Sequence, residues 1–219
     1  MAKPPVVEDS QIRHALKVAS VTGQTPARDV ALLCVLYGTG MTATEVAQLE
    51  VADMLTENGE FRARSEVRAA ISFNGKSRPV YWVNQRIRDA MDAYFAVRIE
   101  AGQGVTAWRS QWRGLVQLGP IFLTVDGRPF ALTTRSTSAG NTSRSCEVLT
   151  EIIKRLHLQA GIEAAGASAA RRTFAVRLHR AGYDLRHIRE VLGLATLSAA
   201  KTLAGTDPVD LGRIVAKVI

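Results

Sequence analysis

The sequence predicts an α+β fold that is mainly α-helical, and two observations support this prediction. Apolar residues recur at helical spacing over much of the chain, for example in "DSQIRHALKVAS" and in "CEVLTEIIKRLHLQAG". Two other stretches, "ISFNGKSRPVYWV" and "IFLTVDGRPF", combine β-favouring residues with Asn-Gly or Asp-Gly turns, which are typical of hairpins. Helices that precede and follow a small antiparallel sheet indicate an α+β domain.

The individual elements can be placed in chain order. After the first helix, a second and more central helix is expected behind Thr25 as its cap and Pro26 at its first position, and it ends at Gly38 and Gly40. A further helix, "NQRIRDAMDAYFAVRIEAG", lies between the two hairpins. The Ser- and Thr-rich stretch 131–145 predicts an exposed loop before a helix over 143–158. The last third is expected to be helical throughout.

The domain organisation follows from these elements. Residues 1–8 contain prolines and are expected to form a flexible tail, and residues 9–205 to form one domain. Residues 206–219 begin with Asp207-Pro208 and place apolar residues on one face of a predicted C-terminal helix. That helix is expected either to fold back on its own core or to dock on a neighbouring subunit, which would make the protein self-associate.

The composition indicates the class of partner. The 219 residues include 28 Lys and Arg against 20 Asp and Glu, so the net charge is +8. This excess favours a polyanion such as nucleic acid. No CxxC pair exists and the four histidines show no ligand spacing, so neither a metal site nor a cofactor is predicted. Without a long apolar run or a disulfide framework, a cytoplasmic protein with no membrane partner is expected.

Four motifs in a fixed order carry a resemblance to a known family. They are "RDVALLCVLYGTGMTATEVAQLEVADM", "NGKSRPVYWV", "PIFLTVDGRPF" and "ARRTFAVRLHRAGYDLRHIREVLG". Over roughly residues 10–205 the chain resembles the catalytic domain of the tyrosine recombinases, also called phage integrases. The resemblance implies a fold in which a tyrosine attacks a DNA phosphate while arginines, a lysine and histidine-type groups surround that phosphate. A separate DNA-clamping domain usually precedes this one, and we expect none here.

The resemblance can be followed residue by residue. It implies that Lys76 in the hairpin turn and Arg171 retain the family's lysine and second arginine. Four positions at which the family carries catalytic groups hold other residues here: Thr42, Ser168, Leu194 and Leu203. Because Leu203 falls on the nucleophile's place and leucine has no nucleophilic chemistry, the sequence predicts that the chain is not an enzyme. Thr42 has a structural explanation, since Thr42 and Glu45 form a capping-box pattern.

The DNA contacts are predicted from the same boxes and from neighbouring clusters of arginines. The expected DNA-binding residues are Lys76, Arg78, Arg135, Arg144, Arg171, Arg172, Arg177 and Arg186. The alternatives are that Arg171 pairs with a buried carboxylate, that Lys76 is a solvated turn residue, and that the other arginines lie on solvated helix faces. Sequence recognition, if present, is expected from the 143–158 helix and the loop before it.

The function predicted from the sequence is therefore DNA binding without catalysis. A regulator or accessory factor of a mobile element, plasmid or phage is the expected role, with double-stranded DNA as the partner. Two alternatives stay open: an active strand transferase with a displaced nucleophile, and a protein-interaction partner of an active recombinase. A helix-turn-helix over residues 171–192 is a further interpretation that also predicts DNA binding.

Overall fold

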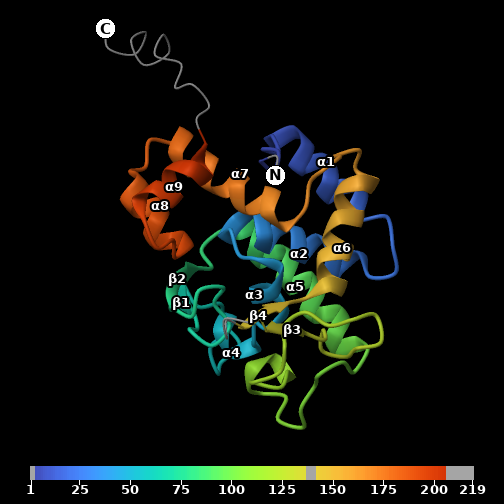
Figure 1. Cartoon of the computed structure of the whole chain (residues 1–219). Helices are drawn as coiled ribbons and strands as arrows, with labels where there is room; N and C mark the ends of the chain where they lie inside the picture. The colour runs from blue at the N-terminus through green and yellow to red at the C-terminus, as the bar shows by residue number, and fades with distance from the viewer. Residues whose placement is uncertain (1–2, 137–141, 206–219) are drawn as a thin grey trace, which may run out of the picture.

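The computed structural model describes residues 3–136 and 142–205, in which helices surround two small antiparallel hairpins (Figure 1). In chain order the elements are Asp9–Ala19 (α1), Pro26–Thr39 (α2), Ala43–Ala47 (α3), Val51–Met54 (α4), Arg64–Val67 (β1), Arg78–Tyr81 (β2), Gln85–Glu100 (α5), Trp112–Gly114 (η1), Thr133–Ser136 (β3), Thr142–Ser145 (β4), Glu147–Gln159 (α6), Ala167–Arg180 (α7), Leu185–Leu192 (α8) and Leu197–Ala204 (α9). This architecture confirms the predicted α+β class with mainly helical content.

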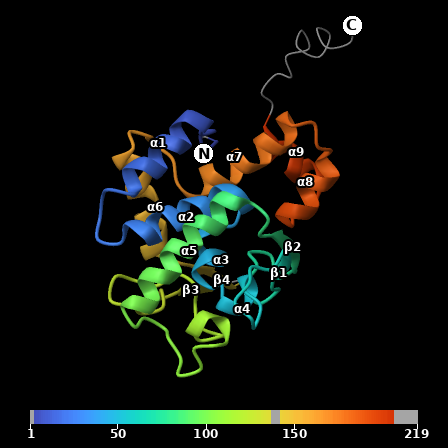
Figure 2. The same ribbon diagram turned by 180° about the vertical axis from the view of Figure 1, so that it is seen from behind.

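Helix α2 is the centre of the main core, as its apolar character on most faces predicts. Leu32, Leu33 and Leu36 are fully buried, and α1, α5 and α7 all pack against this helix. Seen from behind, α5 lies along α2 (Figure 2). Pro26 occupies the start of α2, and Gly40 ends it in the left-handed conformation at φ 65°. Glycine adopts that conformation without steric strain, so the two sequence signals set the length of the helix.

The last two helices form a second, smaller core together with the C-terminal part of α7. Its fully buried members include Ile188, Leu192 and Ala200, and Leu194 and Leu203 are partly buried against them. Helix α7 connects this cluster to the region beside α6, so that α8 and α9 lie on the side of the molecule away from α6 (Figure 1). The C-terminal helices therefore depend on α7 and on a few polar contacts for their attachment to the main body.

The first hairpin differs from its prediction in the position of one strand. Strand β2 pairs with β1, whose residues Arg64 and Val67 lie opposite Tyr81 and Arg78. The stretch "ISF" does not pair, because Ile71 is buried and its backbone N–H closes a turn on the carbonyl of Arg68. Residues 68–77 are thus a long connection that still contains the expected Asn-Gly turn.

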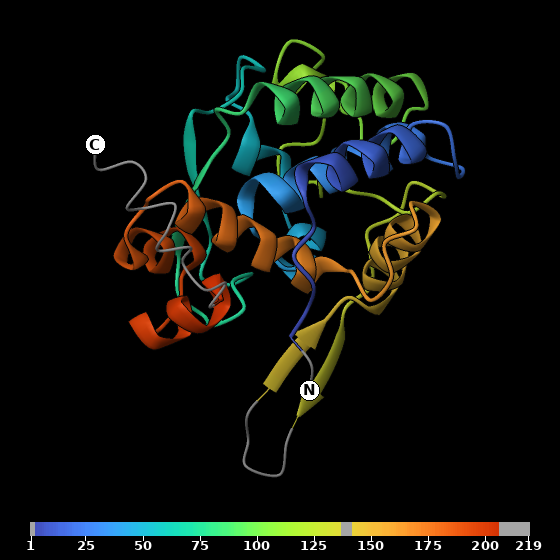
Figure 3. The same cartoon turned by 90° about the horizontal axis from the view of Figure 1, so that it is seen from above.

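The predicted loop over 131–145 instead contains paired strands. Strand β3 pairs with β4 in antiparallel register, and α6 begins at Glu147 rather than at residue 143. Threonine is branched at Cβ and favours extended backbone, which supports these strands even though their side chains are exposed. Figure 3 shows the hairpin projecting from the helical body. The loop prediction was therefore wrong for the described residues of this stretch.

The predictions for the two ends of the chain compare differently with the structure. The expectation of a flexible tail is contradicted at Val7, which is only 1% exposed and donates its backbone N–H to Thr173 Oγ1 at 2.9 Å. The guanidinium of Arg172 also donates to the carbonyl of Pro4. The predicted helix over 206–219 lies outside the described residues. Within 3–136 and 142–205, no helix has the length and apolar character needed to cross a membrane.

Candidate DNA-binding site

A cleft of about 780 Å³ lies between the start of α3, one face of α6 and the start of α7. We call it the α3–α6–α7 cleft. It brings Thr42 together with Ser168 and Arg171, which lie more than 120 residues further along the chain, and all three are positions that the sequence singled out. The fold therefore assembles part of the site that the motif order predicts.

Arg171 stands one turn into α7 and is only 8% exposed. Its Nη1 donates to the carbonyl of Gly40 at 2.6 Å, and its Nη2 donates to the carbonyl of Leu192 at 2.7 Å. Gly40 caps the end of α2 and Leu192 is the last residue of α8, so both acceptors lie at helix C-termini, which carry partial negative charge. The guanidinium also lies over the ring of Phe73, 4.7 Å from its centroid.

The charge of Arg171 is not neutralised by a carboxylate within the described part of the chain. This excludes, for those residues, the alternative that it pairs with a buried acid. Burial and, to a smaller extent, the nearby cation of Arg78 lower the pKa of Arg171, while Glu45 acts in the opposite direction, and together they bring the pKa to about 10. The side chain therefore remains protonated at neutral pH. A buried cation at the wall of an open cleft favours an anion in that cleft.

Thr42 directs its side chain to its own helix. Its Oγ1 accepts from the backbone N–H of Glu45 at 3.2 Å, while the Glu45 carboxylate accepts from the backbone N–H of Thr42 at 2.8 Å. The predicted capping box is thereby confirmed. Thr42, which the resemblance places at a catalytic position, therefore fixes the start of α3 at the edge of the cleft.

Arg78 does not suit the DNA contact predicted for it. It is 3% exposed, and its Nη2 forms a salt bridge with Glu45 Oε2 at 2.8 Å. Its Nη1 donates to the carbonyl of Val191 at 3.2 Å, which ties β2 to α8. The sequence does carry a sign of this burial, because side chains alternate between the two faces of a strand and Arg78 is two residues from Val80. Both residues therefore lie on the inward face of β2, where Val80 is buried. We therefore remove Arg78 from the expected DNA contacts.

Lys76 lies in an exposed part of the connection between β1 and β2. This connection lies beside Arg171, since Phe73 stacks under that guanidinium and Asn74 Nδ2 donates to the carbonyl of Gly193 at 2.6 Å. Within the described residues, the Lys76 side chain has no ion-pair partner. The structure thus brings the two retained family residues to neighbouring segments, although Lys76 does not line the cleft itself.

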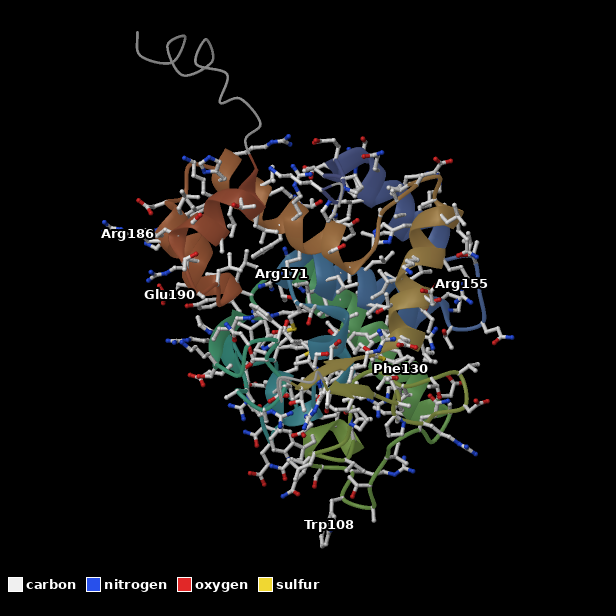
Figure 4. All side chains as sticks on the ribbon, in the orientation of Figure 1. Trp108, Phe130, Arg155, Arg171, Arg186 and Glu190 are labelled. Carbon is white, nitrogen blue, oxygen red and sulfur yellow. The ribbon has the colours of Figure 1, made fainter. Side chains whose placement is uncertain are left out.

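The other predicted contacts are spread over several surfaces. Arg135 and Arg144 lie on the exposed strands of the second hairpin. Arg172 is partly buried and bonds to the N-terminal segment, and Arg177 forms an ion pair with Asp9 of α1 at 3.1 Å. Arg186 is exposed at the outer edge of α8, far from Arg171 (Figure 4). The predicted residues therefore do not form one continuous patch.

Two cations of α6 line the cleft but were not singled out from the sequence. They are Lys154, which pairs with Glu151 at 2.6 Å, and Arg155. Figure 4 places Arg155 on α6, facing away from the α8 side of the molecule. The amphipathic pattern of α6 could have indicated them from the sequence. Its apolar face is buried, so that Lys154 and Arg155 lie on the polar side of the helix. A second carboxylate, Glu163, also lines the cleft.

The four tyrosines fall into two groups. Tyr37 and Tyr94 are buried, and burial raises the pKa of each phenol. Tyr81 on β2 and Tyr183 in the turn before α8 are exposed at 44% and 54%. Leu203, which the resemblance places at the nucleophile position, packs in the second core. No three His, Cys, Asp or Glu side chains in residues 3–136 and 142–205 gather in a way that would hold a metal ion.

Solved structures of recombinases share this fold. The XerA recombinase matches with a TM-score of 0.69 and 19% identity, over 99% of this chain and 65% of that one. The XerH site-specific recombinase bound to palindromic difH substrate matches with a TM-score of 0.65, also at 19% identity, over 99% and 54%. The Tn1549 transposon integrase in complex with transposon right end DNA gives 0.59 at 16% identity, over 98% and 65%.

Sequence relatives correct one prediction. Tyrosine recombinase XerC of Lacticaseibacillus casei (strain BL23) is 30% identical over 203 residues, which cover 90% of this chain and 57% of the relative. Tyrosine recombinase XerD of Rickettsia conorii (strain Malish 7) is 27% identical over 203 residues, with 90% and 58% covered. The chain thus spans a little over half the length of these relatives. Both are named as enzymes, which contradicts the expectation that the chain is not one.

The ordered motifs, the helical fold with Arg171 in its cleft, and these relatives all agree on one family. The sequence pattern that defines the phage integrase family matches residues 5–203, which is most of the chain. The chain belongs to the phage integrase family.

Proposed function

We propose that the chain binds duplex DNA with the face that contains the α3–α6–α7 cleft. The observation that carries this proposal is the buried charge of Arg171, whose hydrogen bonds go to carbonyl oxygens and which forms no salt bridge with a carboxylate in the described residues. A phosphate oxygen supplies the missing negative charge and accepts from the remaining guanidinium N–H groups. Arginine, hydroxyl groups and backbone N–H groups at helix starts are the usual contacts of a DNA backbone.

Three further features support DNA as the anion. Lys154 and Arg155 line the same cleft, and so do Ala167 and Ser168 at the N-terminus of α7, the end of a helix that carries partial positive charge. The net charge of +8 attracts a polyanion over longer distances. Several solved structures with this fold contain DNA, among them the XerH and Tn1549 integrase complexes.

The biological setting of the proposal is DNA recombination or integration. The relatives are named recombinases and one structural neighbour is a transposon integrase. We infer a role as an accessory or regulatory DNA-binding factor of a mobile element, plasmid or phage. We expect an active recombinase as a protein partner, which would co-purify with the chain. We also expect the chain to self-associate through residues 206–219.

The test measures affinity for a fluorescent duplex of random sequence by anisotropy at several salt concentrations. The wild-type chain is expected to bind less tightly as salt rises, because each neutralised phosphate changes the slope of log K against log salt by about 0.9. Arg171→Gln should flatten that slope by about one unit. Between about 50 and about 200 mM salt, one lost phosphate contact changes the salt-dependent drop in affinity by a factor of about 3.5.

A matched control separates the cleft from charge in general. Arg109 lies in the exposed loop after α5, beside the solvent-exposed Trp108 at the far end of the molecule (Figure 4). Arg109→Gln removes the same charge and should leave both affinity and slope close to wild type. Equal effects of the two substitutions, or an unchanged slope in folded Arg171→Gln, would exclude the cleft as the DNA-binding site.

The second candidate function is DNA strand transfer with a displaced nucleophile. The finding that favours it is that the relatives are named recombinases. Tyr81 and Tyr183 are the exposed tyrosines, whereas Tyr37 and Tyr94 are buried. Incubation with a nicked suicide duplex, followed by denaturing electrophoresis and peptide mass mapping, identifies any phosphotyrosine. A covalent adduct that disappears in Tyr81→Phe or Tyr183→Phe would establish this function and its nucleophile.

A further inference from the structure

The hairpin of β3 and β4 has an unusual composition for a paired element. Its eight residues are Thr133, Thr134, Arg135, Ser136, Thr142, Ser143, Arg144 and Ser145. Seven of them are exposed and Ser145 is partly buried, so the hairpin contributes almost nothing to the core. It contains no carboxylate and no large apolar side chain. Protein interfaces are built around aromatic and other apolar residues, whereas hydroxyl and guanidinium groups are typical of DNA contacts.

The strand register divides these side chains between two faces. Residues directly opposite each other in an antiparallel pair project to the same side of the sheet. Thr134 lies opposite Arg144, and Arg135 lies opposite Ser143. Because Arg135 and Thr134 are adjacent in β3, the two arginines project from opposite faces of the hairpin. Both arginines were expected from the sequence to contact DNA, and the strand register places them on different faces of the hairpin.

The two arginines also differ in their partners. Arg135 Nη2 forms an ion pair with Glu147 Oε1 at 2.8 Å, and Glu147 is the first residue of α6. This contact turns the Arg135 face toward the start of that helix. The side chain of Arg144 forms no hydrogen bond or ion pair with residues 3–136 and 142–205. The face that carries Arg144 and Thr134 is therefore the open one.

The hairpin is continuous with the proposed DNA-binding face. Strand β4 ends at Ser145, and one residue later α6 begins, whose Lys154 and Arg155 line the cleft. The hairpin projects beyond the helices (Figure 3). A duplex held at the cleft therefore lies within reach of an exposed ribbon whose position is set by the start of the same helix.

We propose that this ribbon enters a DNA groove and that Arg144 is its specificity-determining residue. The proposal rests on the duplex binding proposed above. The major groove admits a two-stranded ribbon, and strands of four residues span about 13 Å at about 3.3 Å per residue. The planar guanidinium of Arg144 presents two parallel N–H groups that match the two acceptors of a guanine in that groove. Thr134, opposite it, offers a hydroxyl and a methyl group to the neighbouring base.

The experiment compares two substitutions that both keep the positive charge. Arg144→Lys loses the paired N–H groups of guanidinium, and Arg135→Lys makes the same change on the other face. Each variant and the wild type select binding sites from a pool of duplexes with a randomised central sequence. Anisotropy then gives the affinity of each protein for the wild-type selected duplex and for random-sequence duplex at one salt concentration. Circular dichroism confirms that the variants are folded.

The expected result is specific to one arginine. Arg144→Lys should reduce the preference for the selected duplex by about 5- to 150-fold at one base pair, with little change on random DNA. Arg135→Lys should keep the preference. Equal losses in both variants, an unchanged preference in Arg144→Lys, or a wild-type protein that prefers no sequence would each overturn the ribbon's role while leaving duplex binding in place. If the wild type binds no duplex at all, the proposed function fails, and this proposal fails with it.

Discussion

Removing the charge of Glu45 should destabilise the fold more than any neutralisation of a surface acid. The Glu45 carboxylate is fully buried and accepts from Arg78 at 2.8 Å, from the backbone N–H of Thr42 at 2.8 Å and from that of Phe73 at 3.3 Å. Glu45→Gln keeps the shape of the side chain but leaves the buried Arg78 cation unpaired, close to the charge of Arg171. Breaking a buried ion pair from one side reduces the free energy of unfolding by about 3–5 kcal/mol.

Urea unfolding followed by circular dichroism measures this change. Glu151→Gln is the matched control, because it breaks an exposed pair with Lys154 and should change the unfolding free energy by less than about 1 kcal/mol. Adding Arg78→Met to Glu45→Gln should recover part of the loss, since it removes the unpaired charge. A loss below about 1 kcal/mol for Glu45→Gln would refute the structural role assigned to this pair.

Two further predictions concern stability. Burial lowers the pKa of His157 below 6.5, and Tyr37 Oη lies 2.6 Å from its Nε2. The unfolded chain therefore takes up the proton first, so the unfolding free energy should be constant above pH about 6.5 and fall as the pH drops below it. Urea titrations over this range should show a weaker pH dependence in His157→Gln, and an identical one would contradict the assignment. Thr42→Ala removes the side-chain cap of α3 and should lower the unfolding free energy by about 1 kcal/mol, whereas Thr42→Ser should not.

The sequence predicts the helices well because they carry strong local signals. Pro26 and Gly40 bound α2, and Asp184 and Gly193 bound α8, each at the end where the physical preference of the residue applies. Strands β1, β3 and β4 were missed because most of their side chains are exposed. A strand without a buried face shows no alternation of apolar and polar residues, so its composition resembles that of a loop.

The site was only partly predictable. The order of motifs placed Thr42, Ser168 and Arg171 in one region, and the structure brings them to one cleft. The acceptors of Arg171 are backbone carbonyls, which no side-chain pattern reveals. Cations on the polar side of an amphipathic helix look the same in sequence whether they face a cleft or bulk water, and this explains why Lys154 and Arg155 were missed.

Amide hydrogen exchange with and without a duplex tests most directly whether the α3–α6–α7 cleft faces DNA. Peptides from α6 and from the start of α7 should exchange more slowly once a saturating random-sequence duplex is added, because the bound duplex covers their backbone. Peptides from α5, which packs along the opposite side of α2, should exchange at the same rate in both states (Figure 2). Protection of α5 or of the loop around Trp108, without protection of α6 and α7, would contradict the proposed site.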